Sequence, residues 1–430
     1  MRLLLLPALT LLLLGSPSGR AQDAPSRADP PAARPAPEEA ELAAIRFQRL
    51  SVDDGLMQRS VYSILQDRQG FMWFGTQEGL NRYDGYTFTA YKSDPDDPQS
   101  LRSGFIQDIV EAADGTFWVA SGDGGLSHFD PQTGRVLRAL PDHPAHDLHL
   151  DRRGTLWTGG LGLHRLDPQT GAFEAFLPDS TADQPVPQNW ISRLAEAPDG
   201  QIWVGTASGE VLQFDPEVER FTPFGAPGDT HGPIGALHVD RKGAVWAGAW
   251  GLFRLDPETG VTERTLLDPR HPKPDPTAPF VNRIKAIHED GTGALWIGAG
   301  GPLARPDGGG LARFDRDSRA FTRFQHDPSD PTSLSSNNVS TIYEDASGVL
   351  WIGTEGGGLS RFDRVGRPFL LYRHEPGDPN SLRGGTPRGI TLDRDGILWV
   401  GTTGGVLNRF DRLAGTVTHY GPGPGDPSGL

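Results

Sequence analysis

The chain has 430 residues, a formal net charge of −15 at pH 7 and no cysteine. The length allows one large or two medium-sized domains, and the missing Cys excludes disulfides and thiolate metal sites. Gly (56) and Pro (38) favour many turns over long helices, while 36% hydrophobic residues and ten Trp suffice for a core. Arg alternates with Asp and Glu without a basic stripe, so we expect no nucleic-acid partner.

The N-terminus has the pattern of a secretory signal peptide. An apolar run from Leu3 to Leu14 is too short to span a bilayer, and Gly19, Arg20 and Ala21 fit a cleavage site. We therefore predict a signal peptide over residues 1–21, with a signal anchor as the alternative, and a Pro/Ala-rich linker over 22–41. No later stretch is apolar enough to span a membrane, so the mature chain is expected to be exported and soluble.

The rest of the chain repeats one sequence motif, of which "LWIGTEGGGLSRFD" at residues 350–363 is an example. In each copy an apolar pair three residues apart is followed by a turn with Gly three positions before a Trp. The Trp strand, a Gly-containing turn, a strand ending in Asp and an aromatic-rich strand come next. The eight copies are centred on Trp73, Trp118, Trp157, Trp203, Trp246, Trp296, Trp351 and Trp399.

This order of strands and turns predicts four short strands per copy and an all-β fold. One four-stranded sheet cannot bury its own faces, but stacked sheets with a period near 45 residues can do so for one another. We predict a β-propeller of about eight blades over residues 45–430. Within "LWIGT", Trp351 and Gly353 should face a neighbouring blade, with Gly353 permitting close approach. The turn before the strand should place Gly348 at positive φ.

How the ring closes stays open. Residues 45–50, "IRFQRL", look like a strand that can complete the last blade, yet the last copy has its own fourth strand, "TVTHY". Either that strand is displaced, or seven blades close and the eighth copy begins something else.

The stretches "SVYSILQDRQGFMWFGTQEGLNRYDG" and "SLSSNNVSTIYEDASGVLWIGTEGGGLSRFD" resemble the two-component-regulator propeller repeat. The resemblance recurs eight times and covers about residues 45–430. It implies a periplasmic sensor region of bacterial signalling proteins, in which propellers precede a β-sandwich, a transmembrane helix and a histidine kinase or diguanylate cyclase. No β-sandwich, span, kinase or cyclase pattern is found in this chain, so a signalling output is only implied.

If the repeated positions form the core, function is expected where the copies disagree. Thirteen and eleven residues before each Trp, at one mouth of the predicted channel, the residue type varies among polar, aromatic and cationic groups. Such a ring is suited to a small polar or anionic ligand, a saccharide among them. The alternative is that these positions are merely tolerant and solvated. The predicted ligand-binding residues are Arg59, Trp190, Arg283, Lys285, Asn338 and Arg388.

No other pattern indicates chemistry. The stretch "HPAHDLHLD" holds His143, His146 and His149, but the i, i+3 spacing in a predicted strand divides the residues between two faces. We predict no catalytic residue, no metal and no cofactor.

Three functions remain open from the sequence. The first is a non-catalytic ligand-sensing domain of a membrane receptor, working with a C-terminal or partner signalling module. The second is a secreted propeller enzyme such as a lyase, because the fold does not determine the activity. The third is a protein-interaction platform.

Overall fold

The computed structural model describes residues 42, 45–143, 145–167, 171–178, 189–224, 232–256, 262–274, 280–301, 308–363, 374, 381–394, 396–411 and 416–421. The predicted signal peptide and linker, 1–21 and 22–41, lie outside these residues. Within them the chain forms eight four-stranded antiparallel sheets, which confirms the all-β propeller prediction. No helix of the described part is long and apolar enough to cross a bilayer.

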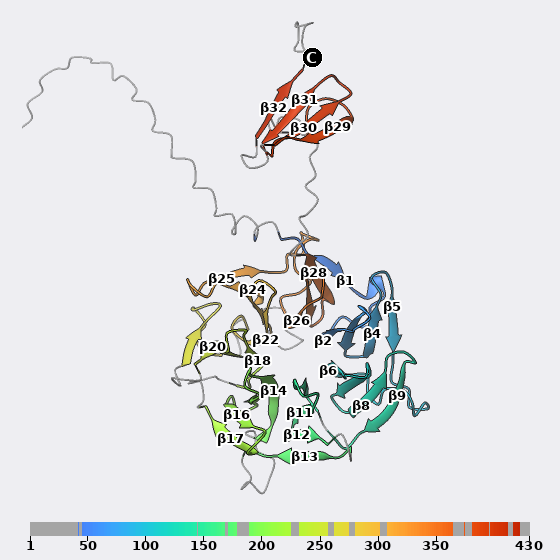
Figure 1. Ribbon diagram of the computed structural model, residues 1–430, viewed down its shortest axis with the longest axis vertical. Coiled ribbons are helices and arrows are strands. Elements are labelled where there is room, and N and C mark those ends of the chain that lie inside the picture. The colour runs from blue at the N-terminus through green and yellow to red at the C-terminus, as the bar shows by residue number, and fades with distance from the viewer. Residues whose placement is uncertain are drawn as a thin grey trace, which may run out of the picture. The chain divides into compact units, whose positions relative to one another are not determined.

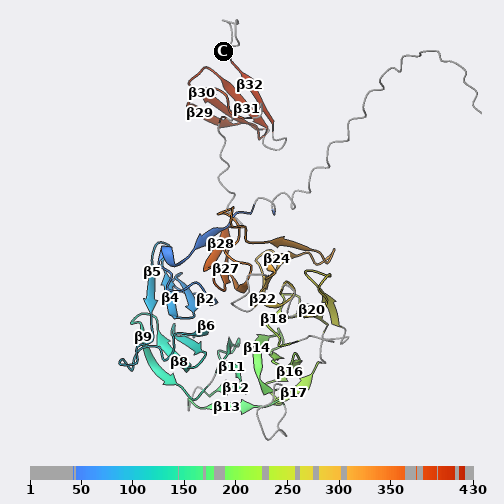
Figure 2. The same ribbon diagram turned by 180° about the vertical axis from the view of Figure 1, so that it is seen from behind.

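Seven of the sheets are the blades of a ring (Figures 1 and 2), and in blades one to six the strands follow one another from the centre outwards. Blade one is β2 (Val61–Gln66), β3 (Met72–Thr76), β4 (Gly79–Tyr83) and β5 (Phe88–Tyr91). Blade two is β6 (Ile106–Glu111), β7 (Phe117–Ser121), β8 (Gly125–Asp130) and β9 (Arg135–Leu140). Blade three is β10 (Asp147–Leu150), β11 (Leu156–Gly160), β12 (Gly162–Leu166) and β13 (Phe173–Phe176).

The second half of the ring repeats this plan. Blade four is β14 (Ile191–Glu196), β15 (Ile202–Thr206), β16 (Val211–Asp215) and β17 (Arg220–Pro223). Blade five is β18 (Ala236–Val239), β19 (Val245–Ala249), β20 (Gly251–Leu255) and β21 (Thr262–Thr265). Blade six is β22 (Ile284–Glu289), β23 (Leu295–Ala299), β24 (Gly310–Phe314) and β25 (Phe321–Phe324). Blade seven is β26 (Val339–Glu344), β27 (Val349–Thr354), β28 (Leu359–Asp363) and β1 (Gln48–Leu50).

The N-terminal strand closes the ring. β1 pairs antiparallel with β28, with Gln48 opposite Arg361 and Leu50 opposite Leu359. The Phe47 ring, 5% exposed, contacts the rings of Phe324 and Phe362 edge-on. A short 3-10 helix, Val52–Asp54, then leads into β2, which packs against β26 and β27 of blade seven. The strand predicted at 45–50 therefore completes the seventh blade by pairing with β28.

The turn before each Trp strand is held by local hydrogen bonds. In blade one, Asp67 Oδ1 accepts from the backbone N–H groups of Gln69 and Phe71, and its Oδ2 accepts from the Trp73 indole at 2.7 Å. The Gly of this turn has positive φ in all eight repeats, as predicted for Gly348, whose φ is 85°. The Asp–Trp bond recurs at 2.7–2.9 Å in Asp151–Trp157, Asp240–Trp246, Asp290–Trp296, Asp345–Trp351 and Asp393–Trp399.

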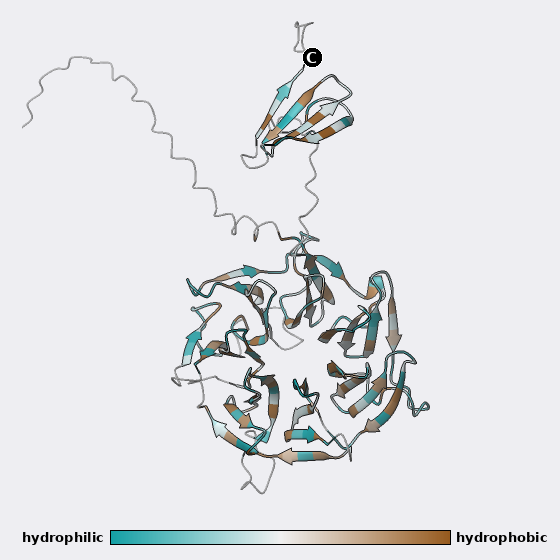
Figure 3. Cartoon of the chain, in the orientation of Figure 1, coloured by the Kyte–Doolittle hydropathy of each residue, from teal (hydrophilic) through white to brown (hydrophobic). Residues whose placement is uncertain are grey.

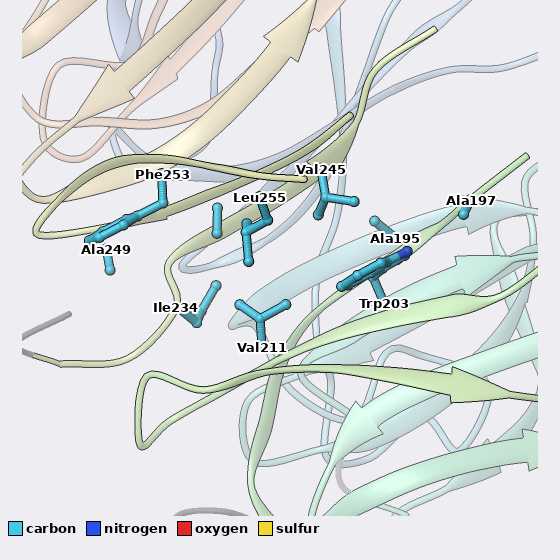
Figure 4. Packing of buried hydrophobic residues seen from close by; sticks show 10 residues of the cluster. Ala195, Ala197, Trp203, Val211, Ile234, Val245, Ala249, Phe253 and Leu255 are labelled. Atoms are coloured by element: carbon cyan, nitrogen blue, oxygen red, sulfur yellow. The ribbon is translucent and has the colours of Figure 1, made fainter. Parts of the chain in front are cut away.

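The core lies between neighbouring blades. As predicted, Trp351 and Gly353 face the next blade, which is blade one. Trp351 is 2% exposed and packs with Val61 and Phe74, and a Cβ added to Gly353 would lie 3.1 Å from Val61 Cγ1. Figure 4 shows the equivalent cluster of Trp203 with Val245 and its neighbours on blade five. Burying Trp faces against aliphatic side chains at each boundary supplies the main stabilisation of the ring.

The eighth copy forms a sheet of its own. Its strands are β29 (Pro387–Leu392), β30 (Leu398–Thr402), β31 (Leu407–Asp411) and β32 (Thr416–Tyr420), and they pair only with one another. Of the two modes of closure considered from the sequence, the structure has seven blades in the ring and one additional repeat. Figure 3 shows hydrophobic residues in this sheet as in the ring, although all six residues of β29 are exposed.

Candidate functional site

A β-bulge shapes the channel wall at the start of most innermost strands. The pairing of the first two strands shifts by one residue between Val61 and Ser63, and at the same place in blades two, four, six and seven. The extra residue of each bulge is the eleventh before the Trp, for example Tyr62 in blade one. A bulge redirects a side chain that strict alternation would place between blades, and Tyr62 lines the central cavity.

The cavity has a volume of about 500 Å³ and is bounded by the innermost strands of all seven blades. Its wall is part polar and part aromatic, with Tyr62 and Phe105 in edge-to-face contact, ring centroids 4.9 Å apart. The lining residues are Tyr62, Ser63, Ile64, Phe105, Gln107, Asp108, His146, Asp147, Arg193, Ala236, Leu237, Lys285, Ala286, Ile287, Ser340, Thr341 and Ile342.

Two carboxylates and one guanidinium stand on successive innermost strands. Asp108 Oδ2 accepts from the backbone N–H of Leu148 on blade three, at 2.8 Å. Asp147 Oδ2 accepts from the N–H of Leu194 on blade four, at 2.7 Å, and its Oδ1 lies 3.8 Å from Arg193 Nη1. These side chains therefore tie blades two, three and four together at the channel wall while lining the cavity.

Burial perturbs the protonation of this group. Burial, reinforced by the negative charge of Asp147, raises the pKa of Asp108 to about 7. Burial also raises the pKa of Asp147, against the opposing effect of Arg193. The pKa of His146 falls to about 4 because the ring is buried and Arg193 lies nearby, so His146 is neutral at pH 7. Perturbed groups of this kind, gathered in a cavity, are typical of binding and catalytic sites.

Lys285 and Glu355 form a second charged group. The Lys285 ammonium donates to a Glu355 carboxylate oxygen and to the carbonyl of Gly301 at 3.1 Å. Burial lowers the pKa of Lys285, while burial and the charge of Glu355 raise the pKa of Tyr62. Because Glu355 follows β27, this ion pair links the channel face of blade six to the loop of blade seven.

The six residues predicted from the sequence are not brought together in one place. Lys285 alone among them lines the cavity. Arg59 is exposed and Arg283 is half-buried, beside β22. Trp190 is 38% exposed, and its ring lies 6.4 Å from that of His146.

The other two have different surroundings. Asn338, 2% exposed, accepts through Oδ1 from the N–H of Gly301 and so orders the loop beside Lys285. Arg388 lies on β29, in the sheet outside the ring, because the eighth copy is not a blade of this propeller. The sequence-based prediction placed all eight repeats around one channel mouth, and for Arg388 this prediction is wrong.

The sequence reasoning missed Asp108, Asp147 and Arg193. All three stand ten residues before their Trp, where the other copies carry Ser, Ala, Thr or Gly. A charged side chain at a position otherwise occupied by small residues was the available signal. This signal could be interpreted only with the bulge known, since in an uninterrupted strand a shift of one residue moves the side chain to the other face of the sheet.

The three histidines of "HPAHDLHLD" also separate in space. His143 bonds Thr158 and stacks on Phe173, His146 lines the cavity, and His149 lies 3.4 Å from Glu196. Within the residues that the structure describes, no group of three or more His, Asp or Glu is placed to hold a metal ion.

The two-component regulator propeller family matches the sequence four times, at residues 55–78, 185–208, 333–356 and 381–404. Four segments of the chain are thus similar to the two-component regulator propeller repeat. Each matched segment covers the first strand of a sheet, the turn after it and the Trp strand, in three blades of the ring and in the eighth sheet. A 55-residue stretch is also 46% identical to Histidine kinase P4 of Formosa agariphila, over 13% of this chain and 4% of that protein.

Solved propellers resemble the fold. The extracellular domain of the protein described as hybrid two component system BT3049, from B. thetaiotaomicron, superposes with a TM-score of 0.61 at 24% identity, over 87% of this chain. The chain spans about half of that structure, 49%. Virginiamycin B lyase from Staphylococcus aureus superposes with a TM-score of 0.54 at 14% identity, over 74% of this chain and 99% of the lyase. Likeness at these identities shows the propeller fold alone.

Proposed function

We propose that this chain is an exported, non-catalytic sensing domain that binds a small polar ligand in the central channel of its seven-bladed ring. The observation that carries the proposal is the cavity of about 500 Å³, in which every blade contributes side chains and the contributed residues differ between blades. Packing between repeats is met by the same residue types in every copy. Residues that differ from blade to blade on the channel wall make the cavity asymmetric, as the binding of an asymmetric ligand requires.

The repeats support a signalling role. Segments similar to the two-component regulator propeller repeat occur in this chain, and a similar propeller belongs to the extracellular domain of the protein described as a hybrid two component system. In the proposed role, a bound ligand alters the contact between the propeller and a kinase or cyclase module of the same receptor. A saccharide is one suitable ligand, because aromatic rings and mixed hydrogen-bonding groups line the cavity.

A ligand screen tests the channel. The wild-type protein is screened by thermal shift against small polar compounds, among them mono- and oligosaccharides, organic acids and amines. Tyr62→Ala removes a wall of the cavity, and Tyr86→Ala, at a 91% exposed position, is the matched control. We expect a stabilising compound whose effect is lost in Tyr62→Ala and retained in Tyr86→Ala. Equal stabilisation of both variants places the ligand elsewhere and contradicts the proposal.

Export is tested separately. Alkaline phosphatase fused after residues 1–41 is active only where disulfides form, so an active fusion supports export and an inactive one contradicts it.

A further inference from the structure

The cavity wall carries two carboxylates and two cations, but one of the cations is paired with a carboxylate outside the wall. Lys285 is paired with Glu355, whereas Asp108 and Asp147 share the single guanidinium of Arg193. That guanidinium is already engaged, because Nη1 donates to the carbonyl of Ser192 at 2.6 Å. One of the two carboxylates therefore lacks a full countercharge when both are ionised.

The pKa of Asp108 reflects burial first and the neighbouring negative charge of Asp147 second. Its carboxylate accepts backbone N–H bonds from Ile109 and Leu148, which favour the ionised form, yet its pKa is raised to about 7. The groups that share the cavity with it are Asp147, His146, Arg193 and Lys285, and His146 is neutral. A cation bound beside Asp108 would supply the missing charge.

Other features of the wall fit an organic cation. Tyr62 and Phe105 present aromatic rings near the same strands, and aromatic faces attract ammonium groups. The described residues offer no group of three His, Asp or Glu for a metal ion, so an amine suits the wall better than a metal.

We propose that the channel ligand carries a protonated amine that binds between Asp108 and Asp147, with its carbon skeleton against Tyr62 and Phe105. This inference rests on the proposed function, because it assigns the chemistry of the ligand at the same site. It also narrows the sequence-based expectation of a polar or anionic ligand. An anion placed beside two carboxylates and one arginine would be repelled.

Matched probe pairs test the amine. Cyclohexylamine is compared with cyclohexanol, and glucosamine with glucose, by isothermal titration calorimetry and ligand-observed NMR at millimolar concentration. We expect each amine to bind more tightly than its alcohol, on the order of tenfold, a typical contribution of a charged hydrogen bond. The preference should disappear in Asp108→Asn and remain in Asp142→Asn, an exposed carboxylate outside the cavity.

The outcomes separate the two proposals. If alcohols bind as tightly as amines and binding is lost in Tyr62→Ala, the amine inference is overturned while channel sensing stands. An amine preference that survives Asp108→Asn also overturns it. Absence of binding by both amines overturns it as well, and the broader screen then decides the proposed function independently.

A second measurement applies if Asp108→Asn does not fold. In the wild-type protein the affinity for cyclohexylamine should rise between about pH 6 and pH 8, as Asp108 loses its proton, while the affinity for cyclohexanol stays constant. Parallel pH profiles for the two compounds would refute the inference.

Discussion

Blade seven and the eighth sheet contain nearly the same sequence, "LWIGTEGGGLSRFD" and "LWVGTTGGVLNRFD", in different surroundings. Both form four strands, and both hold their Trp indole through an Asp at 2.8 Å. Burial differs, because Ile342 on β26 is 9% exposed and the equivalent Ile390 on β29 is 68% exposed. Local sequence thus determines strands and turns, whereas burial depends on a neighbouring blade.

The largest test of this comparison replaces the two tryptophans. Trp351→Ala leaves a cavity against blade one and should reduce the free energy of unfolding by about 3–5 kcal/mol. Trp399 is only half-buried and stacks on Tyr420, so Trp399→Ala should cost about 1 kcal/mol. Urea titrations followed by circular dichroism measure both. Equal losses would mean that the Trp contributes through its own sheet and not across the boundary.

The aspartates of the turns provide the matched local test. Asp345→Ala and Asp393→Ala each remove an acceptor from a Trp indole and from turn N–H groups. Because these bonds lie within one repeat, we expect similar losses of about 2 kcal/mol in both sheets. Hydrogen exchange of the turn amides reports each sheet separately. A loss confined to Asp345→Ala would show that the turn also depends on the adjacent blade.

The glycine two residues after each Trp provides a further comparison between blade seven and the eighth sheet. A Cβ on Gly353 would lie 2.5 Å from Thr341 Cγ2 and 3.1 Å from Val61, so Gly353→Ala should cost about 1–3 kcal/mol. The nearest atom to a Cβ on Gly401 is the Gly389 carbonyl oxygen at 4.0 Å. Gly401→Ala should therefore be neutral within about 0.5 kcal/mol. Thermal unfolding of the pair checks this, and equal destabilisation would contradict the interlock between blades.

A pH-dependent effect is expected for the ring, since the eighth sheet has Gly389 where Asp108 stands. The pKa of Asp108 is about 7 in the fold, above its unfolded value, so its contribution to stability is present at low pH. That contribution is lost as the pH rises toward 7, by about 1 kcal/mol per pH unit above pH 5. Asp108→Asn should flatten this slope in urea titrations, and an unchanged slope would assign the titration to another group.

The sequence predicted more of the fold than of the site. Repeat spacing located all eight Trp strands, and the turn pattern predicted the positive φ of Gly348. For the site it selected positions by their variability, which included Lys285 but also Asn338, a loop-ordering residue. It passed over Asp108, Asp147 and Arg193, because their convergence depends on bulges and on contacts between blades.

By itself, the sequence determined the repeating sheet, since strand alternation, turn glycines and the Asp–Trp bond all act within one repeat of about 45 residues. Only the tertiary structure decided that seven blades close, that β1 completes the seventh, and that two carboxylates and one arginine meet at the channel wall. The physical reason is the distance along the chain over which each interaction acts. Closure and channel charge depend on blade-to-blade packing between residues far apart in the chain, and such contacts leave no periodic signal within a single repeat.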